Sequence, residues 1–125
     1  MTASWTETDR RTVAERLRDL TALPGVEREE ANGHTGYAVA GRRFAWLQVD
    51  HHGDGRLALV VKAPPGEQEA LVGTAPCWFR PAYLGARGWI GVDLAPEAGA
   101  DWDEVAALLD QAWRTTAPRR LLAGS

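Results

Sequence analysis

The sequence predicts an α+β domain in which helices pack on one face of an antiparallel sheet of about six strands. Two patterns carry this prediction: four β-rich segments follow an amphipathic helix pattern, and the strongest helix pattern comes after two more strand-like segments. The expected order is a helix, four strands, a helix, two strands and a helix (α-β4-α-β2-α). A chain of 125 residues is long enough to bury a core, so we expect a single domain over 1–125.

The first helix and the strands that follow have clear boundaries. Val13, Leu17 and Leu20 recur at helical spacing within 8–23, and Pro24 with Gly25 ends that pattern. The next 40 or so residues alternate runs rich in Val, Tyr, Phe and Trp with Gly and Asn clusters. We expect strands near 26–31, 35–40, 42–49 and 56–63, with turns at 32–33, 41 and 53–55.

The second half of the chain holds the remaining elements. A short helix is expected in "GEQEALVGTA", and strands in "CWFRPAY" and "RGWIGVDLA", the first of them weakened by Pro81. The last helix, "DWDEVAALLDQAWRTTAP", begins at a capping Asp101, has Glu104 at the capping-box position and stops at Pro118. Its expected buried stripe is Trp102, Val105, Leu108, Leu109, Ala112 and Trp113.

Composition indicates an ordinary globular protein, with 45% hydrophobic and 25% charged residues. No apolar run approaches the roughly 18 residues of a membrane span, and "MTASWTETDRR" has no apolar signal core, so we expect a cytoplasmic protein without membrane contact. The single Cys77 excludes an internal disulfide and is expected to be a buried thiol. A net charge of −3 gives no global attraction to nucleic acid, so such binding would depend on a local patch.

Strand alternation divides the sheet into two faces, because neighbouring side chains point opposite ways. The aliphatic sets, expected to face the helices, are Ala45, Leu47 and Val49; Leu57, Leu59 and Val61; and Ile90, Val92 and Leu94. The second face then combines aromatic rings with cations, as a surface that stacks bases and contacts phosphates requires. Its candidate residues are Arg42, Phe44, Trp46, Arg56, Lys62, Arg87 and Trp89; Arg43, Arg80, Tyr83 and His52 are secondary candidates. Alternatively, the loop "PAYLGA", a chain end or a second copy of the protein covers these rings.

The stretch "VDHHGDGRL" contains the nitrogen and oxygen donors of a possible transition-metal site: Asp50, His51, His52 and Asp54. Alternation sends His51 away from Asp50 and His52, and His34 could join only if its turn comes near. A solvated hairpin turn is favoured, so no metal or other cofactor is predicted. No motif supports a Cys–His nucleophile or a phosphate loop, and "DWDE" is explained by helix capping. Arg119 and Arg120 fit either a phosphate contact or a solvated tail.

Three segments carry a family resemblance: "GRRFAWLQVDHHGDGRLALVVKAPPGEQEALV", "FRPAYLGARGWIGVDL" and "WDEVAALLDQAWRTTAP". Together they resemble the MmcQ/YjbR family of small bacterial proteins, whose fold is similar to the frataxin/CyaY type. The resemblance implies an α+β sandwich and possible DNA binding through strands and loops, a label that rests on analogy of shape. It implies no catalytic residues. Arginines in the first helix, Arg10, Arg11, Arg16 and Arg18, argue against frataxin-like iron delivery.

The first hypothesis is therefore a non-enzymatic binding module that contacts DNA through the aromatic and basic face. In it Trp46 and Trp89 stack on bases, while Arg42, Arg43, Arg80 and Arg87 meet phosphates. The alternative is a protein-interaction or small-ligand module, possibly a homodimer, that uses the same face. An enzyme is the third possibility.

Overall fold

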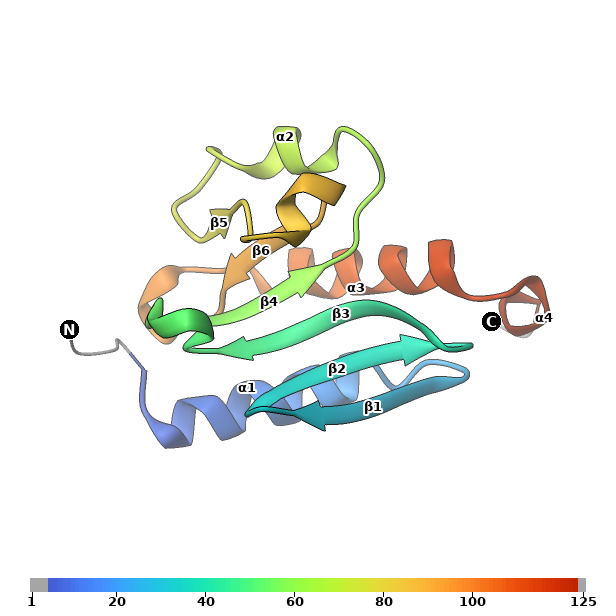
Figure 1. Cartoon of the computed structure of the whole chain (residues 1–125), viewed down its shortest axis with the longest axis horizontal. Coiled ribbons are helices and arrows are strands. Elements are labelled where there is room, and N and C mark those ends of the chain that lie inside the picture. The colour runs from blue at the N-terminus through green and yellow to red at the C-terminus, as the bar shows by residue number, and fades with distance from the viewer. Residues whose placement is uncertain (1–4, 124–125) are drawn as a thin grey trace.

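A computed structural model describes residues 5–123 and contains a six-stranded antiparallel sheet with helices behind it (Figure 1). The strands are β1 (Val26–Ala31), β2 (His34–Val39), β3 (Arg42–Val49), β4 (Leu57–Val61), β5 (Trp78–Phe79) and β6 (Ile90–Asp93), in the spatial order β1-β2-β3-β4-β6-β5. Helices α1 (Glu7–Leu20) and α3 (Trp102–Thr116) lie behind one face (Figure 1). The predicted α+β class with an antiparallel sheet is confirmed.

The remaining elements are short and lie at the margins of the sheet. Helix α2 (Glu67–Leu71) lies beyond the β5 and β6 side of the sheet, and α4 (Arg119–Leu122) lies at the opposite end from the N-terminus (Figure 1). Three 3-10 turns, η1 (His51–Gly53), η2 (Leu84–Arg87) and η3 (Pro96–Ala98), were not predicted, and neither was α4. Strand β5 is shorter than expected because Pro81 lacks the N–H that a sheet ladder needs. In the part of the chain that the structure describes, no helix is long and apolar enough to cross a membrane.

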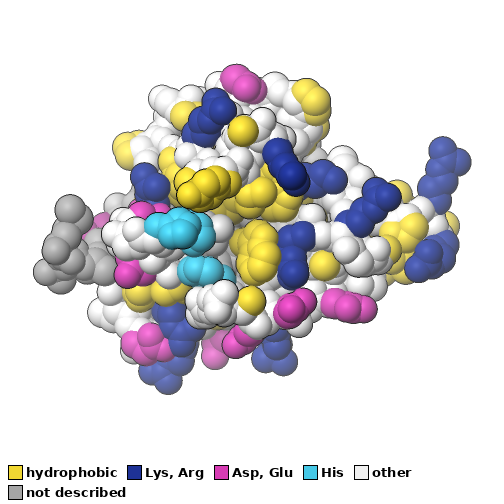
Figure 2. All heavy atoms as spheres, viewed as in Figure 1, with side chains coloured by type: hydrophobic (Ala, Val, Ile, Leu, Met, Phe, Trp, Pro, Cys, Tyr) yellow, Lys and Arg dark blue, Asp and Glu magenta, His cyan; other side chains and the backbone are white. Residues whose placement is uncertain are grey.

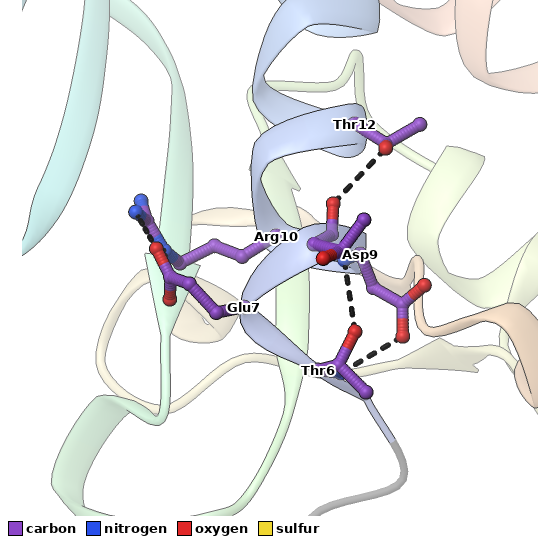
Figure 3. Close-up of polar contacts among 6 residues, drawn as sticks. Thr6, Glu7, Asp9, Arg10 and Thr12 are labelled. Atoms are coloured by element: carbon purple, nitrogen blue, oxygen red, sulfur yellow. Dashed lines mark hydrogen bonds and ion pairs between the residues drawn. The ribbon is translucent and has the colours of Figure 1, made fainter.

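Helix α1 begins with a capping box that the sequence analysis did not identify (Figure 3). The Thr6 hydroxyl accepts from the Asp9 amide at 3.1 Å, and the Asp9 carboxylate accepts from the Thr6 amide at 2.8 Å. Glu7 and Arg10 form an ion pair one turn apart, and the Thr12 hydroxyl donates to the Thr8 carbonyl. These contacts satisfy the free amides of the first turn, a contribution of about 1 kcal/mol for such a cap.

The hydrophobic core lies between the sheet and the two long helices. The α3 side chains expected to be buried are buried, apart from Trp102, which is half-buried under the guanidinium of Arg16 at 4.3 Å. Trp113 is fully buried, and its indole N–H donates to the Pro24 carbonyl at 3.0 Å. The aliphatic sets predicted to face the helices belong to this core: Ala45, Leu47, Leu57, Leu59, Val61, Ile90, Val92 and Leu94 are buried in it, and Val49 packs against it. The other face of the sheet, called the open face below, lies toward the viewer in Figure 1.

Candidate functional site

One line of residues crosses the open face from β2 to β5. The strand register pairs Gly36 with Trp46, Trp46 with Val60, Val60 with Gly91, and Gly91 with Phe79. Paired residues share a face of the sheet, and their neighbours Leu47, Leu59 and Val92 are in the core on the other side. We call Gly36, Trp46, Val60, Gly91 and Phe79 the central row. It places one half-buried aromatic ring toward each end, with a fully buried Val60 between them.

The first ring lies flat over a glycine. A β-carbon at Gly36 would lie 3.0 Å from Cζ3 of Trp46 and would overlap the Arg43 guanidinium, so only glycine fits below this pair. The Arg43 guanidinium lies 4.3 Å from the Trp46 ring centroid, within cation–π range. It also forms an ion pair with Glu29 at 3.5 Å. Gly36, Trp46 and Arg43 therefore form one stacked unit.

The second ring repeats this arrangement on β5 and β6. A β-carbon at Gly91 would lie 2.5 Å from both Cε2 and Cζ of Phe79, so the Phe79 ring covers the glycine directly. The Arg56 guanidinium lies 3.9 Å from the centre of the Phe79 ring and pairs with Asp54 at 3.9 Å. Each end of the central row thus consists of a glycine floor, an aromatic ring and an arginine plane, in which the arginine is held by a carboxylate.

Tyr83 is the most exposed large hydrophobic side chain of the described residues, with 80% of its surface accessible. Its backbone angles, φ 64° and ψ −64°, belong to the strained form of the γ-turn, which the Leu84 amide closes on the Ala82 carbonyl at 2.7 Å. Such a conformation costs about 1–3 kcal/mol in a bulky residue, and strain of this kind concentrates at functional sites. The Tyr83 ring lies edge-on to His52, with centroids 6.0 Å apart.

The three histidines of the chain gather at the end of the sheet beside Tyr83. His34, on β2, accepts the Val49 amide through Nδ1 at 3.0 Å, and its Nε2 lies 3.3 Å from Nδ1 of His51. The rings of His51 and His52 are 4.0 Å apart between centroids. Burial, followed by the neighbouring charges of His52 and His34, lowers the pKa of His51 from its ordinary value of 6.5.

These contacts determine the role of His34. Because its Nδ1 accepts a backbone N–H, the proton of the neutral ring is on Nε2, which then donates to His51. A nitrogen that carries a proton cannot bind a metal. Within residues 5–123, no group of three or more His, Cys, Asp or Glu side chains is arranged to hold a metal ion. The cluster is a hydrogen-bonded support for the loop from Asp50 to Gly55.

That loop is a tight turn with several left-handed residues. Asp50 and His52 have φ of 48° and 54°, and the Asp50 carboxylate accepts the Gly55 amide at 2.7 Å. The indole N–H of Trp5 donates to the Gly55 carbonyl at 2.9 Å, which holds the loop from the side of the N-terminus. The loop leads directly into Arg56, so it positions the cation that stacks on Phe79.

Three of the predicted face residues lie elsewhere. Phe44 is fully buried in the core, because a β-bulge pairs Tyr37 with Ala45 and Ala38 with Arg43, which leaves Phe44 as the extra residue and reverses the alternation before it. The same bulge pairs Arg42 with the core residue Val39, on the helix side, and brings Arg43 onto the open face beside Trp46. Trp89 is only 8% exposed, because the 80–88 loop folds back beside it.

The other predicted residues lie on or beside the open face. Trp46 and Arg56 are in the two stacked units, and Lys62 alternates with Val60 and so shares its side. Arg80 and Arg87 are exposed on the 80–88 loop with Tyr83, while His52 is exposed in the 50–55 loop. Sequence reasoning missed Phe79, Gly36 and Gly91 as members of the site. A signal was available at Gly91, because a glycine in the middle of a strand often marks a place where another group approaches closely.

Charge is divided across the open face. Register places Glu27 and Glu29 of edge strand β1 on this side, whereas Arg56, Lys62, Arg80 and Arg87 belong to β4, its flanks and the 80–88 loop. Figure 2, viewed from the open side, shows hydrophobic side chains at the centre, histidines next to them, Lys and Arg around the upper half and acidic groups below. The upper half of this face is therefore the half suited to an anionic partner.

The fold and this face define the class of protein, a small α+β domain with a sheet open on one side. The comparison with protein families identifies it further: the YjbR family model matches residues 21–115. The match covers all six strands and nearly all of α3, so the chain belongs to the YjbR family. No curated protein matches the chain.

Proposed function

We propose that this YjbR-family protein is a non-enzymatic binding module that holds an unpaired nucleic-acid strand, such as single-stranded DNA, on its open face. The observation that supports this most strongly is the pair of stacked units, each with an aromatic ring on a glycine and a guanidinium on the ring. Bases stack on aromatic rings and on guanidinium planes alike, whatever their sequence.

Unpaired strands fit this surface better than duplexes do. In a duplex the base faces are covered by their neighbours, and only edges in the grooves can be reached. The open face offers planes, at Trp46 and Phe79 with their arginines and at the exposed Tyr83, rather than a projecting helix that would enter a groove. We therefore expect a preference for single strands.

Charge favours a particular path across the face. Phosphates are attracted to Arg56, Lys62 and the arginines of the 80–88 loop and are repelled by Glu27 and Glu29 on β1. The net charge of −3 limits nonspecific attraction, so binding depends on this local patch. For single strands the logarithm of the binding constant then falls with the logarithm of salt concentration by about 0.7 per phosphate neutralised.

Fluorescence polarisation with labelled single- and double-stranded DNA of equal length tests the proposal. We expect a salt-dependent rise with the single strand and a smaller one with the duplex. Trp46→Ala should weaken single-strand binding about tenfold or more, since stacking contributes about 1–3 kcal/mol per base. The matched control is Trp102→Ala, because Trp102 carries an equivalent arginine stack, from Arg16 at 4.3 Å, on the helix side. Unchanged polarisation at low salt, or equal losses in the two variants, would contradict the proposal.

Self-association is the second candidate function for the same surface. The 80% exposure of Tyr83 and the half-buried rings of Trp46 and Phe79 favour it, because exposed aromatic groups often mark protein interfaces. Under this alternative, sedimentation shows a concentration-dependent species of twice 13.6 kDa. Loss of that species in Trp46→Ala would assign the open face to the dimer.

A further inference from the structure

We propose that the groove between α2 and the 80–88 loop is a separate subsite for the phosphodiester backbone of the bound strand. This inference rests on the proposed function and adds to it the place where the phosphates bind. The groove has a volume of about 340 Å³, within the range of small-ligand clefts. Its wall includes two arginines, Arg80 and Arg87, together with the glycines Gly66, Gly85 and Gly88.

The arginines supply the chemistry that recognises a phosphate. A guanidinium stays charged at all accessible pH values and presents a planar set of N–H donors that matches two phosphate oxygens. Both Arg80 and Arg87 are exposed, and neither forms an ion pair with a carboxylate among the described residues. This separates them from Arg43 and Arg56, which are held by Glu29 and Asp54.

The groove is built by specific contacts rather than by a loose loop. Gln68, only 5% exposed, donates from its amide to the carbonyls of Gly85 at 2.9 Å and Trp89 at 2.6 Å, and so ties α2 to η2. A β-carbon at Gly85 would lie 2.6 Å from Cγ of Arg80, so the arginine side chain lies flat against that glycine. The walls are thus fixed before a ligand arrives, which lowers the entropy lost on binding.

The groove is continuous with the aromatic surface. Phe79 ends the central row, and the next residue, Arg80, lines the groove. On the neighbouring strand, Val60 is in the row, Lys62 points to the same side and Ala63 lines the groove. A strand with a base stacked at Phe79 therefore has its next phosphates directed toward Arg80 and Arg87.

One carboxylate opposes the two arginines. Glu69 also lines the groove and lowers its positive charge, which makes a prediction specific to an anion site. Removing that charge with Glu69→Gln should strengthen phosphate binding, whereas a merely structural role for the groove gives no reason for such a gain. Glu69 is exposed, so the fold should tolerate the change.

The test uses the full chain and two probes: pyrophosphate alone and single-stranded oligothymidylate. In amide NMR spectra of the wild type, pyrophosphate should shift the signals of 66–69 and 85–88. The double variant Arg80→Gln/Arg87→Gln should lose those shifts, and its salt slope for oligothymidylate should fall by about 1.4. The matched control, Arg11→Gln/Arg119→Gln, removes the same two charges from exposed positions on α1 and α4 and should change neither readout.

The outcomes separate the subsite from the proposed function. If Trp46→Ala weakens oligothymidylate binding but the Arg80/Arg87 variant and its control behave alike, the subsite is refuted while the nucleic-acid function stands. If pyrophosphate shifts the groove signals but oligothymidylate does not bind, the nucleic-acid function fails and with it the assignment to a phosphodiester backbone. Binding to phosphatidylglycerol vesicles that depends on both arginines, without oligothymidylate binding, would assign the groove to lipid headgroups and overturn the proposal. Tighter binding by Glu69→Gln supports it.

Discussion

Gly91→Ala is the substitution that most directly tests how the second stacked unit is built. The added β-carbon would lie 2.5 Å from two Phe79 ring atoms, whereas carbon atoms pack at about 3.5–4.0 Å, so the ring has to move by more than 1 Å. Overpacking costs about 1–3 kcal/mol. Losing the Arg56 stack costs about 0.5–1 kcal/mol, and alanine in place of a strand glycine returns a similar amount. The net expectation is a loss of about 2 kcal/mol.

Urea unfolding followed by circular dichroism measures this loss. With a slope of about 2 kcal/mol per M, the midpoint should fall by about 1 M without a change of slope. The same substitution in a Phe79→Ala background should be neutral or slightly stabilising, because no ring remains to be displaced. Equal losses in both backgrounds would show that the Phe79 ring is not what excludes a side chain at position 91, and the structure of the unit would be wrong.

Three further predictions concern single residues. Because the pKa of His51 is lowered by burial, the unfolded chain binds the proton more readily, so stability should decrease as pH falls below about 6.5 and level off below the folded pKa; urea midpoints against pH should be flatter for His51→Gln. Burial raises the pKa of the Cys77 thiol, which is 4% exposed, so a thiol reagent at pH 7 should react slowly until denaturant is added, and fast reaction with the folded protein would contradict this. Tyr83→Gly should relieve the γ-turn strain and leave stability unchanged or higher by up to about 2 kcal/mol, while DNA polarisation falls; a stability loss above about 1 kcal/mol would refute the assigned strain.

Strand boundaries and the core could be predicted because they depend on local patterns. The expected strands at 26–31 and 42–49 coincide with β1 and β3, and the aliphatic sets of three strands line the core as alternation indicated. The α3 stripe follows in the same way from helical spacing, except at Trp102, where Arg16 of α1 covers a ring that is only half-buried.

The face residues were harder to predict because they depend on contacts between distant segments. Alternation assumes an unbroken register, and the one extra residue at Phe44 exchanged the sides of Arg43 and Phe44. No local pattern distinguishes that bulge from a regular strand. Trp89 and Phe79 were misjudged for a related reason, since the return of the 80–88 loop covers one and the pairing of β5 with β6 places the other over Gly91.

The stretch "VDHHGDGRL" illustrates the same limit. Its Gly and Asp residues predicted a turn, and they form one, with Asp50, His52, Gly53 and Gly55 in the left-handed region. The partner that organises it, His34, comes from another strand and could only be suspected. Its acceptance of the Val49 amide, rather than any property of the stretch itself, decides that the histidines form a hydrogen-bonded chain.

The most direct test of the central claim is a map of DNA contacts on the folded protein. In amide and indole NMR spectra, titration with single-stranded oligothymidylate should shift the Trp46 indole signal and the amides of β3, β4 and the 80–88 loop. Signals of α3 and of the Trp102 indole, on the helix side, should stay in place. Shifts confined to the helix side, or no shifts at low salt, would contradict the claim that the open face binds nucleic acid.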